Sequence, residues 1–132
     1  MNPILARLDQ NPVIAAVRSR EEIGRAASSP VEAVFLLCGD ILTVKEDVLS
    51  LRQAGKLIFV HMDLLGGIGR DAAAVDFLAQ VAEPDGIIST RSQMIRCAKE
   101  RGLLTIQRFF LLDSQSAAMT AETAAASRPD LA

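Results

Sequence analysis

The chain has 132 residues, of which half are apolar, and its formal net charge is −2. This length and composition predict one globular domain with a hydrophobic core, and no apolar run approaches the ~18–20 residues of a membrane-spanning helix. The slightly acidic balance gives no general attraction to nucleic acid, so an RNA partner would need a local basic patch.

The first residues predict a short lead-in segment, 1–10, and no secretory signal. The start, MNPILARLDQNP, lacks a basic end followed by a long apolar block. Without an export signal, Cys38 and Cys97 are expected to be reduced thiols. The spacing of these two cysteines does not match a metal site.

Five short apolar runs predict five strands. Each run is apolar on both faces, which is typical of strands buried on two sides in a parallel sheet. The predicted strands are 12–17, 33–39, 56–64, 86–90 and 103–111.

Amphipathic segments separate these runs and predict the helices 19–29, 42–55, 69–82 and 91–102. Gly55 and Gly102 are expected to end two of them, because glycine adopts the left-handed conformation that closes many helices. An Ala-rich helix is predicted over 117–128. The residues expected to form the buried stripes are Val44, Val48 and Leu51, then Val75, Leu78 and Val81, then Ile95 and Ala98.

The alternation of strands and helices predicts an α/β fold with a parallel sheet and right-handed crossovers. The sheet could be open or closed as a (β/α) barrel, and we favour an incomplete TIM-like barrel. Pro-Asp precedes an apolar residue both at 83–89, before the fourth strand, and at 128–132, so a sixth strand is expected to begin there and to be cut off. The whole chain, 1–132, would form one partial barrel domain with five full βα units.

Polar side chains gather where the strands end. In the third strand, alternation places Phe59, His61 and Asp63 on one face and Ile58, Val60 and Met62 on the other. Because the carboxyl ends of parallel strands meet at one edge, we expect one shared ligand site. The residues at or after the other strand ends are Arg18, Asp40, Ser89, Thr90, Arg91, Gln107 and Arg108. A core histidine, bonded to a backbone carbonyl or to Asp63, is the alternative interpretation of His61.

The loop GGIGRD, residues 66–71, offers Gly66, Gly67 and Gly69 for positive φ angles and close backbone approach. An anion could bind the loop amides beside Arg70, with Asp71 starting the next helix; a flexible turn is the alternative. The segment STRS, 89–92, also offers hydroxyls and amides to a phosphate, although Arg91 could be only a solvated charge.

Residues 91–108 form the most basic segment. Arg91, Arg96, Lys99, Arg101 and Arg108 stand against Glu100 alone. Such a run is usually a solvated helix face, but it is also the first candidate for contact with a nucleic-acid backbone. The sequence has no Walker-type loop, paired metal ligands or nucleophile elbow, so no metal, cofactor or catalytic residue is assigned.

Several strings of the sequence resemble the glycerol-3-phosphate-responsive antiterminator family. They are NPVIAAVRS, SPVEAVFLLCGDI, FVHMDLLGGIGRD, AVDFLAQVAEPDGIISTRS and GLLTIQRFFLLDS, and the similarity runs from about residue 11 to 116. The resemblance implies a cytoplasmic regulator with a phosphate-binding barrel fold that senses glycerol 3-phosphate and binds the leader mRNA of glycerol-utilisation genes. The matching site or loop residues are Arg18, Asp40, His61, Asp63, Gly67, Gly69, Arg70, Asp71, Ser89, Thr90, Arg91, Gln107 and Arg108. Family members continue through further strands, whereas this chain stops at Ala132.

Our first hypothesis is therefore an effector-gated RNA-binding regulator, with glycerol 3-phosphate at the barrel mouth and Arg96, Lys99 and Arg101 as RNA contacts. No membrane partner is expected, and a homo-oligomer stays open. One alternative is a phosphate-binding barrel enzyme of the isomerase or lyase type, with His61 as acid and base and Asp63 orienting it. The other alternative is a truncated copy without function.

Overall fold

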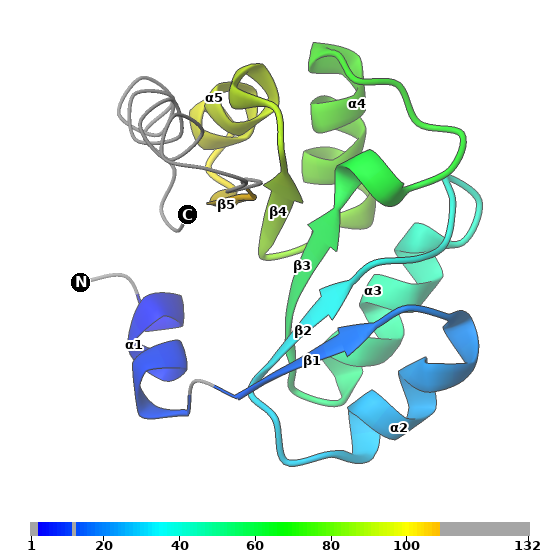
Figure 1. Cartoon of the computed structure of the whole chain (residues 1–132), viewed down its shortest axis with the longest axis vertical. Helices are drawn as coiled ribbons and strands as arrows, with labels where there is room; N and C mark the ends of the chain where they lie inside the picture. Colours follow the sequence, from blue (N-terminus) through cyan, green and yellow to red (C-terminus); the bar gives the residue numbers. More distant parts are fainter. Residues whose placement is uncertain (1–2, 12, 109–132) are drawn as a thin grey trace, which may run out of the picture.

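A computed structural model describes residues 3–11 and 13–108 of the chain. Its sheet holds five parallel strands in the order in which they occur in the chain (Figure 1). They are β1 (Ile14–Val17), β2 (Ala33–Leu36), β3 (Leu57–His61), β4 (Gly86–Ser89) and β5 (Leu104–Gln107). The predicted Ala-rich helix, the start of a sixth strand and residues 109–111 of the fifth predicted strand lie outside the described residues.

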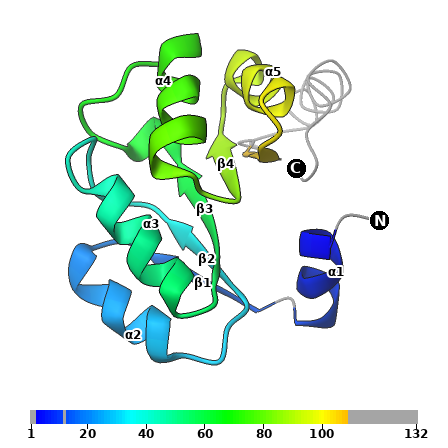
Figure 2. The ribbon, with the colours of Figure 1, turned by 180° about the vertical axis from the view of Figure 1, so that it is seen from behind.

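The helices that follow the first four strands lie together on one face of the sheet (Figures 1 and 2). They are α2 (Ile23–Ser28), preceded by the 3-10 turn η1 (Arg20–Glu22), α3 (Val44–Gln53), α4 (Ala72–Phe77), continued by the π-helical turn η3 (Leu78–Ala82), and α5 (Ser92–Glu100). A sequential strand order with all crossovers on one face is the winding of a β/α barrel, because doubly wound sheets carry helices on both faces. The predicted α/β fold class is confirmed. Within the described residues, β1 and β5 form the two edges of the sheet.

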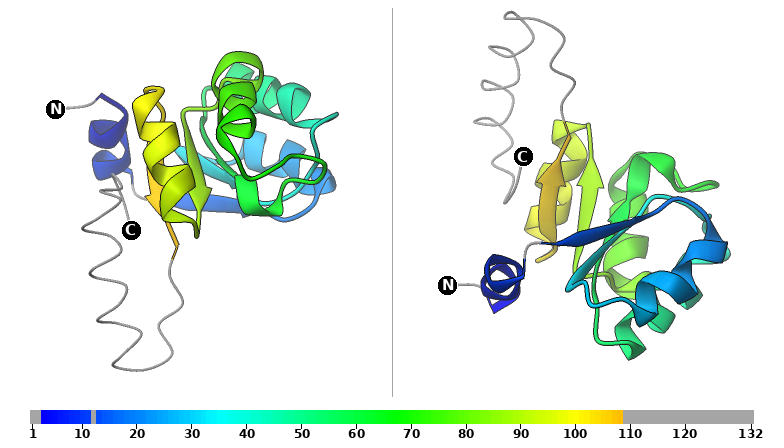
Figure 3. Two further views of the ribbon diagram at one scale, coloured as in Figure 1. Left: turned by 90° about the horizontal axis from the view of Figure 1, so that it is seen from above. Right: turned by 60° about the horizontal axis from the view of Figure 1, so that its bottom comes forward.

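The lead-in segment contains a helix that the sequence analysis did not predict, α1 (Pro3–Gln10). It stands away from the other helices in Figure 1 and in the right view of Figure 3, and its Ile4 and Leu8 pack against the apolar face of the sheet that α2–α5 leave uncovered. Arg7 forms an ion pair with Glu32 and donates a hydrogen bond to the Gly55 carbonyl at 3.0 Å. This helix therefore covers part of the inner face of the curved sheet.

The two faces of each strand belong to two separate apolar clusters. Ile58, Val60 and Met62 pack under the helices, as alternation predicted. Phe59 lies in the cluster on the opposite face, where its ring meets the ring of Phe35 edge-on at 5.7 Å. Phe59 also packs over Gly86, because a Cβ atom at that position would lie 2.8 Å from the Phe59 ring and 2.6 Å from the Leu104 carbonyl oxygen.

The predicted helix stripes are confirmed for α3 and α5, whose stripe residues are all buried. The prediction is wrong for Val81, which is 42% exposed. The helix widens to a π turn from Leu78, closed by the bond from the Glu83 amide to the Leu78 carbonyl at 2.8 Å. A π turn adds a residue to the turn, so Ala82 takes the buried position in place of Val81.

Candidate functional site

The carboxyl ends of β3, β4 and β5 bring five of the predicted site residues together. We call His61, Asp63, Ser89, Thr90 and Arg108 the mouth cluster. Hydrogen bonds link its members to one another, as described below. Parallel pairing places them at the same end of the sheet, since His61 is opposite Ile88 and Ser89 is opposite Gln107.

His61 is almost fully buried, and its Nε2 atom lies 3.1 Å from Nη1 of Arg108. A guanidinium only donates, so Nε2 accepts and the ring proton is assigned to Nδ1. Among the described residues, the buried Nδ1 atom has no hydrogen-bond partner. Burial lowers the pKa of His61 and Arg108 lowers it further, while Asp63 partly opposes them, so the imidazole is neutral near pH 7.

Asp63 directs its carboxylate to the turn that follows β4. The strand β3 ends at His61, and the 3-10 turn η2 (Met62–Leu64) carries Asp63 toward its neighbour strand. Oδ1 accepts from Ser89 Oγ at 2.9 Å, and Oδ2 accepts from the amide and hydroxyl of Thr90 at 2.8 and 2.7 Å. Burial alone raises the pKa of Asp63, but these hydrogen bonds outweigh it and the net pKa lies below its usual range. Asp63 is therefore ionised and bonded within the protein.

The same turn is held from two other sides. Ser89 Oγ accepts from the Arg91 amide at 3.0 Å, and the Ser89 carbonyl accepts from the Arg108 amide at 3.0 Å. Arg91 itself is exposed and stands immediately before α5. The backbone from Ser89 to Arg91 is thus fixed between Asp63 and the end of β5.

The Gln107 side chain contacts the start of α5. It is fully buried, and its Nε2 donates to Ser92 Oγ at 3.0 Å, at the first residue of α5. Successive strand residues point to opposite faces, so Gln107 lies on the helix side while Arg108 points to the His61 side.

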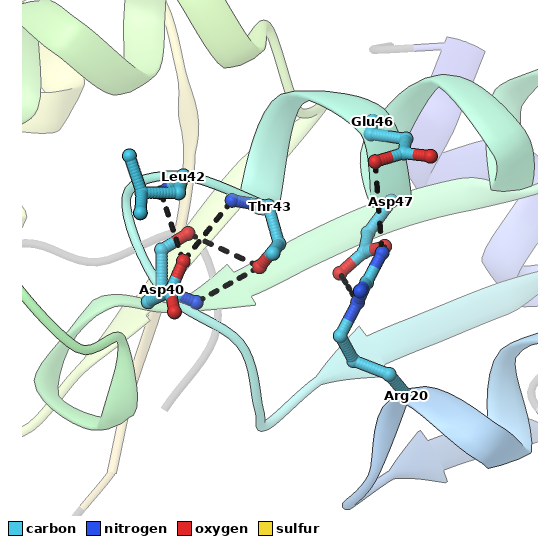
Figure 4. Close-up of polar contacts among 6 residues, drawn as sticks. All are labelled: Arg20, Asp40, Leu42, Thr43, Glu46 and Asp47. Carbon is cyan, nitrogen blue, oxygen red and sulfur yellow. Dashed lines mark hydrogen bonds and ion pairs between the residues drawn. The ribbon is translucent and has the colours of Figure 1, made fainter.

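Arg18 and Asp40, at the ends of β1 and β2, have local partners. The exposed Arg18 donates its backbone amide to Glu22 Oε2 at 3.0 Å. Asp40 Oδ1 accepts from the amides of Leu42 at 2.8 Å and Thr43 at 3.1 Å, which shapes the start of α3 (Figure 4). The carboxylate of Asp40 is therefore used in a turn of its own loop.

An ion pair that the sequence analysis missed lies beside this turn (Figure 4). Asp47 is only 3% exposed, and its Oδ1 accepts from Arg20 Nη2 at 2.8 Å, while both its oxygens lie 3.2 Å from Arg20 Nε. This pair joins η1 to α3. A carboxylate among the buried residues of an amphipathic helix was the available signal, but its partner lies 27 residues away.

The glycine loop packs against the preceding loop. Gly66 forms an isolated parallel bridge with Asp40, in which the Gly66 amide donates to Gly39 at 3.0 Å and the Gly66 carbonyl accepts from Ile41 at 2.9 Å. Gly67 follows with a φ of +76°, a conformation that glycine adopts readily. These glycines therefore let two loops approach closely.

The other polar residues of this loop have partners as well. Asp71 starts α4 as predicted, because its Oδ1 accepts from the Ala74 amide at 3.0 Å. An anion at this helix start would meet that carboxylate. Arg70 is exposed, and its Nη2 donates to the Asp63 carbonyl at 3.3 Å, while Gly69 is also exposed.

Two of the three predicted RNA contacts are exposed side chains of α5, Arg96 and Lys99. Arg101 is half-buried, forms an ion pair with Asp76 and donates to the Cys97 carbonyl at 3.0 Å. It thereby ties α5 to α4. RNA contact by these residues stays a prediction.

The described residues contain no group of three or more His, Cys, Asp or Glu side chains that could hold a metal ion. None of the helices within residues 3–11 and 13–108 is long and apolar enough to cross a membrane. The mouth cluster instead contains the exposed Arg108 guanidinium, the neutral His61 imidazole, and two hydroxyls that donate to the ionised Asp63 carboxylate. Its guanidinium can bind a small anion.

The chain is similar to known proteins both in sequence and in structure. The model of the family "Glycerol-3-phosphate responsive antiterminator" matches residues 13–132. The uncharacterized protein YgcP of Escherichia coli (strain K12) is 39% identical over 128 residues, which cover 97% of this chain and 67% of that protein.

Two solved structures are similar to the chain. The glycerol uptake operon antiterminator regulatory protein of Listeria monocytogenes has a TM-score of 0.84 and 31% identity, covering 89% of this chain and 63% of that one. A glycerol uptake operon antiterminator-related protein of Thermotoga maritima has a TM-score of 0.80 and 34% identity, covering 89% and 66%. The chain thus spans slightly less than two thirds of the length of these two proteins. The family match over residues 13–132 and the two similar structures show that the chain belongs to the glycerol-3-phosphate responsive antiterminator family.

Proposed function

We propose that the chain is a regulator that binds glycerol 3-phosphate at the mouth cluster and, in response, binds the leader mRNA of glycerol-utilisation genes in the cytoplasm. The observation that carries this proposal is the convergence of Arg108, His61 and the Ser89–Arg91 turn at the carboxyl ends of three neighbouring parallel strands. Family membership supports the identity of the ligand.

The ligand's two chemical parts match two parts of the site. The phosphate would be bound by the guanidinium of Arg108 and by that of the exposed Arg91, which the Ser89–Arg91 turn positions, since charge-assisted hydrogen bonds to phosphate are strong. The glycerol hydroxyls can act as donors and acceptors toward His61. Bound ligand would compete with His61 for the Arg108 guanidinium, which lies 3.1 Å from the imidazole in the structure.

The geometry favours binding over acid–base catalysis. In the contacts of the described residues, the Asp63 oxygens accept from Ser89 and Thr90, so Asp63 does not orient the His61 ring. The Nε2 atom of His61 faces a permanent cation, which disfavours proton uptake. A general base needs an accessible lone pair near its substrate, and this one is occupied.

Effector control of RNA binding would act through the loops around the cluster. Residues 62–71, which we call the β3–α4 loop, contact the β4–α5 turn through Asp63 and the β2–α3 loop through Gly66. A ligand that binds one arrangement of these loops better shifts the population toward it. The exposed Arg96 and Lys99 on the neighbouring α5 are the proposed RNA contacts.

The test is a calorimetric titration of the full chain with glycerol 3-phosphate, followed by gel shifts with the leader RNA at fixed salt. Arg108→Gln should weaken effector binding at least about tenfold, because it removes a charged hydrogen-bond donor. Arg25→Gln is the matched control, since it makes the same charge change on the exposed surface of α2. Binding energies are reciprocal, so effector must tighten RNA binding by the factor by which RNA tightens effector binding. Equal affinity of wild type and Arg108→Gln for glycerol 3-phosphate would overturn the proposed site.

A further inference from the structure

We propose that Asp63 is a positioning residue, which does not touch the ligand but fixes the Ser89–Arg91 turn in the shape that binds phosphate. This inference rests on the proposed function and assigns Asp63 a different role from the ligand contact that the sequence analysis expected. The affinity of the site would then depend on Asp63, a group that does not itself contact the ligand.

The contacts of the carboxylate carry the inference. A carboxylate has about four lone-pair sites, and three hydrogen bonds between 2.7 and 2.9 Å already occupy both oxygens of Asp63. All three donors belong to Ser89 and Thr90, the two residues that lead from β4 into the turn. About one lone-pair site is left to accept a bond from a ligand, so most of the carboxylate's hydrogen-bonding capacity is used within the protein.

The charge of Asp63 also has the wrong sign for a phosphate contact. Its hydrogen bonds stabilise the ionised form, so a bound phosphate would face a second anion across the turn. The same charge is favourable when it acts on the turn, because a carboxylate that accepts from an amide and two hydroxyls fixes all three donors. The Arg91 amide is fixed in the next step, since it donates to the Ser89 hydroxyl that Asp63 holds.

Asp63 is held from its other side as well. Its backbone belongs to η2, the Leu65 amide donates to the Met62 carbonyl at 3.3 Å, and Arg70 donates to the Asp63 carbonyl. The carboxylate therefore transmits the position of the β3–α4 loop to the β4–α5 turn. Loosening either end should loosen the phosphate site.

The experiment compares variants of the full chain by calorimetric titration with glycerol 3-phosphate and, separately, with inorganic phosphate. Asp63→Asn keeps the size of the side chain but removes its charge and one acceptor. Asp85→Asn is the matched control, since Asp85 also accepts a backbone amide, that of Ile58 at 2.8 Å, but lies at the opposite end of the same strands. A merely structural carboxylate of this kind affects thermal stability and not ligand affinity.

Asp63→Asn is expected to lower the affinity for glycerol 3-phosphate and for inorganic phosphate by the same factor, about 10- to 100-fold. Asp85→Asn should leave both affinities unchanged. A contact with the glycerol hydroxyls predicts instead that only glycerol 3-phosphate is weakened. Thr90→Val, which removes the hydroxyl that donates to Asp63, should cause part of this loss of affinity. Thr90→Ser keeps a hydroxyl and should bind both ligands as well as the wild type does. The double variant Asp63→Asn, Thr90→Val should bind the ligands no more weakly than Asp63→Asn alone, because both changes act on the same bond between Asp63 and Thr90.

Hydrogen exchange of the Thr90 amide gives a measurement that does not need the ligand. This amide should be protected in the wild type and in Asp85→Asn, and should lose protection in Asp63→Asn. Unchanged protection, additive losses in the double variant, or a loss limited to glycerol 3-phosphate would each overturn the positioning role. If the wild type binds neither ligand, the proposed function itself is refuted. If the wild type and Asp63→Asn bind glycerol 3-phosphate and inorganic phosphate with equal affinity, only this inference is refuted.

Discussion

Replacing Gly86 with alanine tests the packing on which the sheet beneath the mouth cluster depends. An alanine Cβ would lie 2.6 Å from the Leu104 carbonyl oxygen and 2.8 Å from two atoms of the Phe59 ring, whereas ordinary contacts begin at 3.4 Å. Because Gly86 pairs with Leu104 in the sheet, relief requires the backbones of β4 and β5 to separate or the ring to move.

The size of the effect follows from two opposing contributions. Inserting a methyl group into a well-packed core costs about 1–3 kcal/mol, and a clash with backbone lies at the upper end. Alanine also restricts the unfolded chain and returns about 0.5–1 kcal/mol. We therefore expect Gly86→Ala to lower the free energy of unfolding by about 2 kcal/mol, which corresponds to roughly 6–12 °C in Tm for a domain of this size.

Gly24→Ala is the matched control, because it makes the same substitution within α2, where no atom lies within 4 Å of the added Cβ. It should raise the free energy of unfolding by about 0.5–1 kcal/mol. Far-UV circular dichroism during urea unfolding is the suitable measurement, since the chain contains no Trp and no Tyr. A Gly86→Ala midpoint equal to or above that of the wild type, with an unchanged m-value, would refute the packing of Phe59 on Gly86.

Three further predictions concern stability. Acidification below about pH 4 should destabilise the protein, because the pKa of Asp63 is lower in the folded than in the unfolded state. The contribution of Asp63 to the free energy of unfolding is lost as pH falls through the folded pKa. Asp63→Asn should therefore flatten this part of the plot of urea midpoint against pH. The pKa of His61 is also lowered by folding, so stability should decline as pH falls below about 6.5 toward the folded pKa, and a His61→Gln profile as steep as that of the wild type would contradict this. Asp71→Ala removes the cap of α4 and should cost about 1 kcal/mol in urea unfolding, and no loss would show that the bond to Ala74 contributes nothing.

Hydrophobic periodicity was sufficient to predict the order of elements and the fold class. Two-sided burial identifies β3, and the buried stripe of Val44, Val48 and Leu51 identifies α3, because both patterns depend on neighbours within a few residues. The pattern of Ile4 and Leu8, four residues apart, was an available signal for α1. The strands β2 and β3 were predicted to extend too far, since apolar residues continue past the last residue of each strand.

The site was predicted in part, and its errors have a physical origin. Alternation was extended to Asp63, but the strand ends at His61 and the following 3-10 turn sends that carboxylate to β4. The sequence did contain a signal for Gln107. Neighbouring strand residues point to opposite faces, so Gln107 and Arg108 cannot both face His61, and Gln107 lies on the helix side. The pairing of Arg101 with Asp76, 25 residues apart, depends on how two helices pack, which local pattern does not reveal.

The sequential strand order has a consequence for how the chain folds. Within residues 13–108, each strand pairs with the strands next to it in the chain, so forming this part of the sheet closes no loop longer than one crossover. Low loop-closure entropy allows assembly to spread from any pair of adjacent units, as in a repeat protein. Hydrogen exchange should then show protection that declines from β3 toward the edge strands β1 and β5.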